Sequence, residues 1–146
     1  MPHSQDTRHM RYETLYIMLL IFASGLFLAG ALLDTPDNIA RGLIRIVMTE
    51  DPLITDYVRL AGVGAALINS SVVTALSVLI LRSSGEPANG FTLVVVGLMA
   101  GFSLFGKNFV NIWPILLGSW LYAKLRREPF GKYVPTGLLS TALAPV

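Results

Sequence analysis

The stretch LAGVGAALINSSVVTALSVLIL, residues 60–81, decides the fold class because no charged residue interrupts it. A helix of about 20 apolar residues crosses the roughly 30 Å hydrocarbon core of a bilayer. This stretch and its flanks therefore predict a transmembrane helix over residues 58–82. Asn69 and the hydroxyl-bearing residues between it and Ser77 make the helix more polar than spanning requires. They either form hydrogen bonds between packed helices or line a polar path, and both interpretations stay open at this stage.

The composition of the 146-residue chain also favours a membrane location. Hydrophobic residues make up 53% of the chain and charged residues 14%, and the mean hydropathy is +0.63. Soluble domains carry about 25% charged residues. We therefore expect an all-α, polytopic transmembrane bundle in the cell (inner) membrane, with the lipid bilayer as its main partner.

The sequence excludes several classes of function. Cysteine is absent, so there is no disulfide framework, thiolate metal site or cysteine nucleophile. The two histidines, His3 and His9, lie in the polar N-terminal segment, and the net charge of +2 is too small to indicate nucleic-acid binding. Signatures of metalloproteases, hydrolases and P-loop enzymes do not occur. We expect no enzymatic activity, no cofactor and no metal site.

A second uncharged run predicts another transmembrane helix over residues 14–33, beginning beside Tyr12 as an interfacial anchor. The polar tail before it, residues 1–13, is expected to be disordered or interfacial. The run is longer than the apolar core of a cleavable signal, which has about 7–15 residues, so we expect the helix to be retained. Small residues such as Gly25 and Gly30 suit close packing against another helix.

Between these spans, residues 36–49 (PDNIARGLIRIVMT) predict a short amphipathic helix. Pro36 and Asp37 are typical of a helix start. Arg41 and Arg45 are four residues apart and therefore share a face, with the aliphatic residues roughly opposite. The segment is too short and too charged to span, so it predicts an interfacial helix, with a re-entrant half-helix as the alternative.

The last third of the chain predicts two short apolar arms, residues 91–106 and 109–124, which meet near Lys107. The first arm is shorter than a full span, so the pair predicts a short helical hairpin or a broken helix. Residues 136–146 predict the start of a further helix. Because they are too few to span, we expect the chain to be part of a longer protein or to be completed by a partner, such as a second copy of itself. The transmembrane region as a whole is residues 14–146.

The distribution of lysine and arginine predicts the orientation. The N-terminal tail contains Arg8 and Arg11, and residues 124–132 contain four basic residues. The connection over residues 34–59 balances its arginines with five acidic residues. We expect a multi-pass protein with its N-terminus and the 124–132 segment on the cytoplasmic side.

Lys107 is the residue that most strongly suggests a function. An ionisable group between two apolar arms is unfavourable unless it is solvated, paired or functional. In a broken helix it would lie at the start of the second arm, where free N–H groups also attract anions. Lys107, Asn108 and Asn111, with Asn69 of the second span, are the candidate substrate-binding residues. Alternatively, Gly-Lys-Asn is an ordinary turn and the lysine reaches the far interface.

Three segments resemble an uncharacterised family of bacterial and archaeal multi-spanning membrane proteins, the domain of unknown function with the number 1576. The most specific motifs are DPLITDY and FGKNFVNIWPI. The resemblance covers roughly residues 14–146 and implies that this chain is an N-terminal portion, since family members continue past the ALAP element. It carries no established activity and therefore transfers no functional residue. The segments are residues 41–70, 97–124 and 137–146.

Two functions from different classes stay open. One is a channel or secondary-transporter-like subunit for a small polar or anionic solute, which requires Lys107 and Asn69 to face a common polar cavity. The other is a non-transporting membrane scaffold or assembly subunit. It rests on small-residue pairs that suit helix association, Gly97/Gly101 and Gly62/Ala66.

Overall fold

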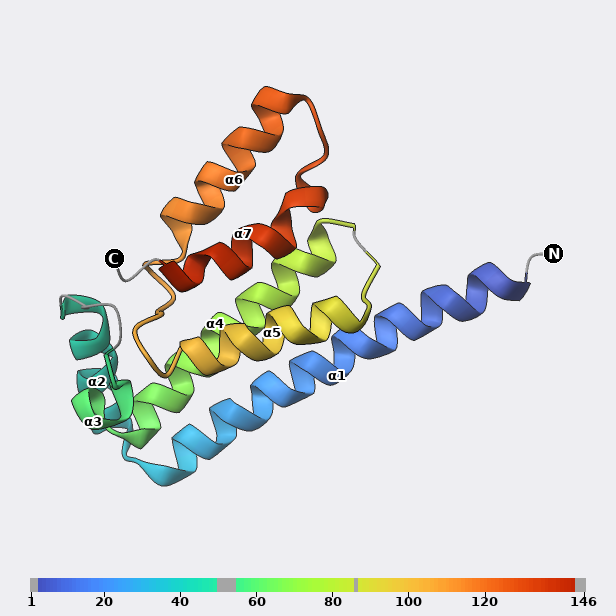
Figure 1. Ribbon diagram of the computed structural model, residues 1–146. Coiled ribbons are helices and arrows are strands. Elements are labelled where there is room, and N and C mark those ends of the chain that lie inside the picture. The colour runs from blue at the N-terminus through green and yellow to red at the C-terminus, as the bar shows by residue number, and fades with distance from the viewer. Residues whose placement is uncertain (1–2, 50–54, 86, 144–146) are drawn as a thin grey trace.

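The computed structural model describes residues 3–49, 55–85 and 87–143, and every regular element within those ranges is helical (Figure 1). The all-α bundle predicted from the sequence is therefore confirmed. The last residues of the predicted helix over 136–146 lie outside the described part of the chain, as does most of the DPLITDY motif.

Two long helices and one shorter helix form the centre of the bundle. Helix α1 (His3–Leu33) packs along α4 (Val63–Ser83), and α5 (Gly90–Phe102) packs against α4 as well. The N-terminal part of α1 extends beyond the other helices (Figure 1). The remaining elements lie around this centre.

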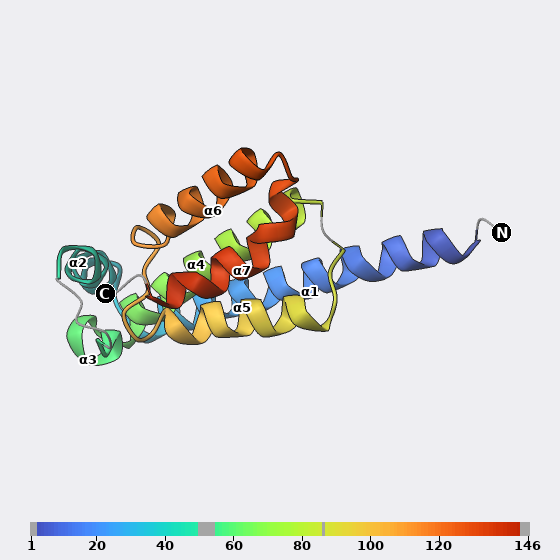
Figure 2. The same cartoon turned by 45° about the horizontal axis from the view of Figure 1, so that its top comes forward.

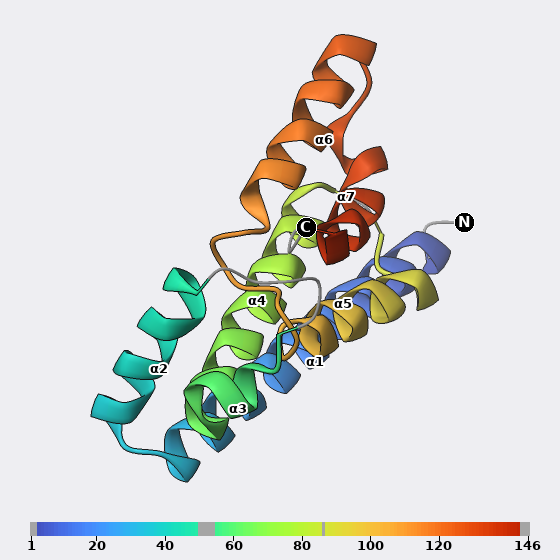
Figure 3. The ribbon, with the colours of Figure 1, turned by 60° about the vertical axis from the view of Figure 1, so that its left-hand side comes forward.

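The shorter elements occupy two regions. Helices α2 and α3 lie together at one end of the bundle (Figures 1 and 3). Helix α7 packs against both α5 and α6, while α6 leans outward from the bundle (Figure 2). Their bounds are α2 (Pro36–Met48), α3 (Tyr57–Ala61), α6 (Trp113–Arg126), η1 (Phe130–Tyr133), α7 (Val134–Ser140) and η2 (Thr141–Leu143).

Helix α1 is longer at its N-terminus than the sequence indicated. It begins at His3, so the prediction of a disordered tail over residues 1–13 is wrong for residues 3–13. Glycine and proline are absent from residue 3 to residue 24, so nothing in that stretch interrupts a helix. The interfacial alternative for this segment stays a prediction.

The second span is shorter than predicted because the helix is interrupted at Gly62. The φ angle of Gly62 is 89°, a conformation that favours glycine. The interruption separates α3 from α4, and the Asp56 side chain caps α3 by accepting the N–H of Arg59 at 3.0 Å. The predicted helix over 58–82 is therefore a short helix followed by a span that begins at Val63.

Helices α1 and α4 approach closely where two glycines meet. A Cβ atom at Gly30 would lie 2.8 Å from the carbonyl oxygen of Gly64, and one at Gly64 would lie 3.0 Å from that of Gly30. Ser71 of α4 also donates a hydrogen bond to the carbonyl of Ala23 at 2.8 Å. A Cβ at Gly25 would meet nothing within 4 Å. The predicted small-residue packing thus involves Gly30 but not Gly25.

The segments Tyr12–Leu33 and Val63–Ser83 are long and apolar enough to cross a membrane. Only 22% of the α1 window is buried inside the protein, and Leu32 is 85% exposed. Contiguous apolar surface of this kind is rare in soluble monomers and is normal toward lipid. These two helices indicate a membrane protein.

The glycine contact generates a stability prediction. Gly30→Ala should lower the free energy of unfolding by about 1–3 kcal/mol, because the added methyl group meets backbone that cannot move without separating α1 from α4. Gly25→Ala, on the same helix and in open space, should be neutral or slightly stabilising. Thermal unfolding of both variants in detergent measures the difference. Equal effects would contradict the proposed contact.

Candidate functional site

The chain between α5 and α6, residues 103–112, forms a non-helical break at the same end of the bundle as α3 (Figure 1). Gly106 has a φ angle of 108°, which ends any helix there. The N–H of Tyr57 donates to the carbonyl of Leu104 at 3.0 Å, which attaches α3 to the break. The predicted arms over 91–106 and 109–124 are corrected to Gly90–Phe102 and Trp113–Arg126.

Asn108 and Asn111 hold the break in its conformation. The Oδ1 atom of Asn108 accepts the N–H groups of Val110 and Asn111, both at 2.9 Å. The Oδ1 atom of Asn111 accepts the N–H of Asn108 at 2.9 Å, and its Nδ2 donates to the carbonyl of Gly106 at 2.8 Å. Such side-chain bonds replace the helical ones that the break lacks. Both asparagines therefore have a structural role in this state.

The side chain of Asn69 fastens the break to α4. Asn69 is fully buried, and its Nδ2 donates to the carbonyl of Ser103 at 2.8 Å and to that of Lys107 at 2.9 Å. Its Oδ1 atom has no hydrogen-bond partner among the described residues. Leaving a buried acceptor unpaired costs about 1–3 kcal/mol, so this oxygen is a site where a donor would bind favourably.

Lys107 is buried inside the bundle and is 1% exposed. Its Nζ lies 3.0 Å from the Sδ of Met99 and 5.4 Å from the ring centre of Phe102, both on α5. No carboxylate of the described residues forms an ion pair with it. The lysine lies in the break between α5 and α6. The Lys107 side chain therefore lies inside the protein rather than on an exposed turn, and its position relative to the membrane interface stays a prediction.

The structure adds three residues that the sequence analysis did not identify. The Sδ of Met99 also accepts a contact from the Oγ1 of Thr141 at 3.5 Å, and the Ser103 hydroxyl donates to the Met99 carbonyl. Thr141 and Ser103 are both fully buried. A polar residue in an apolar run was the only sequence signal for Ser103 and Thr141, and Met99 gave none. Asn69, Met99, Ser103, Lys107 and Thr141 form what we call the buried polar cluster.

The other polar residues of α4 connect helices. The Ser70 hydroxyl donates to the carbonyl of Ala100 on α5 at 2.8 Å, and Ser71 reaches α1. Thr74 and Ser77 donate to carbonyls of α4 itself. Of the two interpretations of the polar stripe, interhelical hydrogen bonding accounts for Ser70 and Ser71. Among the buried side-chain oxygens of the described residues, only the Oδ1 atom of Asn69 has no hydrogen-bond partner.

The described residues contain no group of three histidine, aspartate or glutamate side chains placed to hold a metal ion. The buried polar cluster contains one cationic side chain and otherwise neutral ones. It offers one positive charge together with hydrogen-bond donors and acceptors.

The fold and the buried polar cluster define a helical membrane protein with an interrupted helix pair. The family described as "Protein of unknown function (DUF1576)" matches residues 35–146, and the chain belongs to that family. The resemblance noted in the sequence is thereby confirmed, over a shorter range than residues 14–146. No curated protein and no solved structure matches the chain.

The asparagine pair gives a second prediction. Asn111→Ala should lower the free energy of unfolding by about 1–3 kcal/mol, because it leaves the Asn108 N–H and the Gly106 carbonyl unpaired in a part-buried loop. Val110→Ala, in the same loop with a side chain 47% exposed, should change it by less than about 0.5 kcal/mol. Thermal unfolding measures both. A loss no larger for Asn111→Ala than for Val110→Ala would refute the structural role.

Proposed function

We propose that this chain is a channel or secondary-transporter-like subunit for a small polar or anionic solute, and that it is multi-pass in the inner membrane. The observation that carries the proposal is the buried ammonium group of Lys107, which has no carboxylate partner among the described residues. A buried charge without a counter-ion is costly unless a ligand or water compensates it. A solute anion would supply the missing partner.

The Oδ1 atom of Asn69 makes the cluster complementary to a more specific class of solute. The Nδ2 atom of Asn69 donates to the carbonyl of Lys107, so the unpaired Oδ1 lies on a residue in direct contact with the lysine. The buried polar cluster therefore offers a donor, the Lys107 ammonium group, and an acceptor, the Asn69 oxygen. A small solute with both an anionic group and a hydrogen-bond donor, such as a hydroxy acid or a protonated phosphate, would use both. Inorganic phosphate and lactate are therefore the first probes.

The depth of the cluster also supports transport. Asn69 lies six residues after Val63, the first residue of α4, which corresponds to about 9 Å along the helix axis. The Lys107 ammonium group lies against Met99 and Phe102 in the last turn of α5. Interrupted helices that hold polar groups are a recurring feature of solute-binding sites in transporters.

The arrangement of the helix ends fits the predicted orientation. The start of α1, the connection from α4 to α5 and the corner after α6 lie toward one end of the bundle (Figure 1). Helices α2 and α3 and the break lie at the opposite end. With a cytoplasmic N-terminus, the basic residues 124–132 are cytoplasmic as well, as the distribution of positive charge favours. The buried polar cluster then lies nearer the other side.

A membrane scaffold is the second candidate, and one observation favours it. Added Cβ atoms at Gly97 and Gly101 of α5 would meet nothing within 4 Å, so this small-residue face is open to a partner helix. Under this function Gly97→Leu abolishes association measured by cross-linking in membranes. Normal association of that variant would remove the main support for a scaffold.

Replacing the lysine tests the transport proposal. Lys107→Met keeps a similar volume, removes the unpaired charge, and should raise the free energy of unfolding by about 1 kcal/mol or more. It should also abolish flux of phosphate or lactate into vesicles that contain the protein. Stability gained together with function lost is typical of a functional residue and not of a structural one.

Lys124→Met is the matched control, because Lys124 is exposed on α6. It should leave both flux and stability unchanged. Flux that persists in Lys107→Met, or a variant less stable than the native chain, would count against a solute site at Lys107.

A further inference from the structure

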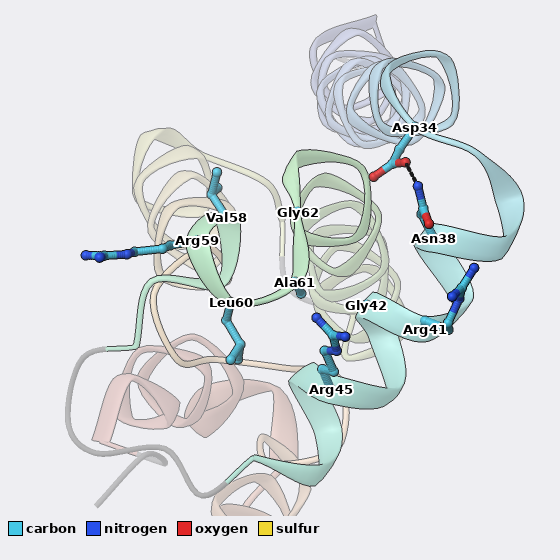
Figure 4. Close-up of a pocket in the computed structure, with 10 residues that line it drawn as sticks. All are labelled: Asp34, Asn38, Arg41, Gly42, Arg45, Val58, Arg59, Leu60, Ala61 and Gly62. Atoms are coloured by element: carbon cyan, nitrogen blue, oxygen red, sulfur yellow. Dashed lines mark hydrogen bonds between the residues drawn. The ribbon is translucent and has the colours of Figure 1, made fainter.

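A second polar site lies at the end of the bundle formed by α2 and α3. A cavity of about 330 Å³ opens between α2, α3 and the junction of α1 with α2 (Figure 4). Three arginines line it together with Asp34 and Asn38, and the remaining wall consists of Gly42 of α2 and apolar residues of α3 with its C-cap Gly62. The arginines are Arg41, Arg45 and Arg59.

The walls of this groove are held in place by close packing. A Cβ atom at Gly42 would lie 2.4 Å from the Cβ of Ala65 and 2.5 Å from the carbonyl oxygen of Ala61. Helix α2 therefore contacts α3 and α4 with no space between them at this point. Ile46, one turn further along α2, is fully buried against the same surface. Because the helices are fixed, the groove exists before any ligand binds.

The acidic side chains described around the groove are already engaged. Asp34 accepts the N–H of Thr35 at 2.8 Å and the side-chain amide of Asn38 at 2.9 Å. Asp37 forms an ion pair with Arg41.

Asp56, the third described carboxylate of this region, caps α3. Arg45 and Arg59 have no carboxylate partner among the described residues. Arg45 and Arg59 can therefore bind an anion without breaking an ion pair to a described carboxylate.

Arg45 is the arginine directed into the groove. Its guanidinium group extends from α2 toward Ala61 (Figure 4). The side chains of Arg41 and Arg59 point away from this space, on the outer sides of their helices (Figure 4). A planar guanidinium group is the side chain best suited to bind the two oxygens of a phosphate. Arg45 is therefore the main contact for an anion in the groove.

The position of the groove selects the kind of anion. It lies where the two candidate spans end and begin, at Leu33 and Val63, and so at the level of lipid headgroups. Helix α2 also exposes two apolar side chains, Ile44 at 60% and Met48 at 79%. A short helix that exposes arginines and apolar residues together is typical of the membrane interface.

We propose that the groove between α2 and α3 binds the phosphate of an anionic phospholipid headgroup. Arg45 forms the central contact, Arg59 supplies positive charge at the rim, and the acyl chains lie against the exposed side of α2. This site is separate from Lys107 and does not depend on the proposed transport function.

Native mass spectrometry of the chain in a mild neutral detergent tests the proposal. Dioleoyl-phosphatidylglycerol is titrated against the native chain, Arg45→Gln and Arg126→Gln, with dioleoyl-phosphatidylcholine as the zwitterionic comparison. Arg126 is exposed at the end of α6, so its replacement changes the net charge equally without touching the groove. Circular dichroism confirms that each variant is helical.

The expected result is a preference for phosphatidylglycerol that weakens about tenfold in Arg45→Gln and stays unchanged in Arg126→Gln. Equal binding of the two lipids, or an equal loss in both variants, would overturn the proposal. Displacement of the lipid by millimolar inorganic phosphate would also overturn it, since the groove would then be a site for a soluble anion.

Discussion

The two hydrogen bonds from the Asn69 side chain determine how the rest of the structure is arranged. They attach the carbonyl groups of Ser103 and Lys107 to the middle of the first half of α4. A non-helical segment inside a membrane protein requires partners for its backbone groups, because lipid offers none. Asn69 supplies these partners from one side, and the mutual bonds of Asn108 and Asn111 supply them within the segment. With the backbone satisfied, the side chain of Lys107 can remain inside the bundle.

Helix α3 connects the two polar regions of the protein. Its first residue, Tyr57, is fully buried, donates its N–H to Leu104 of the break, and accepts a side-chain hydrogen bond from Asn108 at 3.2 Å. Its remaining residues line the groove between α2 and α3. The short helix exists because Asp56 caps its start and Gly62 permits the turn into α4. One turn of helix therefore contacts both the groove and the break.

The sequence predicted those features that depend on local pattern. Uncharged runs identified both spans, the arginine spacing identified α2, and an isolated lysine between apolar arms identified the break. It did not predict the interruption at Gly62, because a glycine in an apolar run is equally compatible with a continuous helix. The ends of α5 and α6 were misplaced because Asn108 and Asn111 compete for backbone groups that pattern alone assigns to helices. The contacts of Lys107 with Met99, and of Met99 with Thr141, join distant segments, and neither composition nor spacing reports such contacts.

The accessibility of position 107 in intact membranes tests the central claim most directly. The chain has no cysteine, so Lys107→Cys creates a single thiol target for a small anionic thiol reagent. Ala65→Cys provides a fully buried reference and Ser83→Cys an exposed one. The account predicts labelling at position 107 at a rate between these references, because a solute must be able to reach this residue. Labelling as slow as at position 65 would contradict a solute-accessible site.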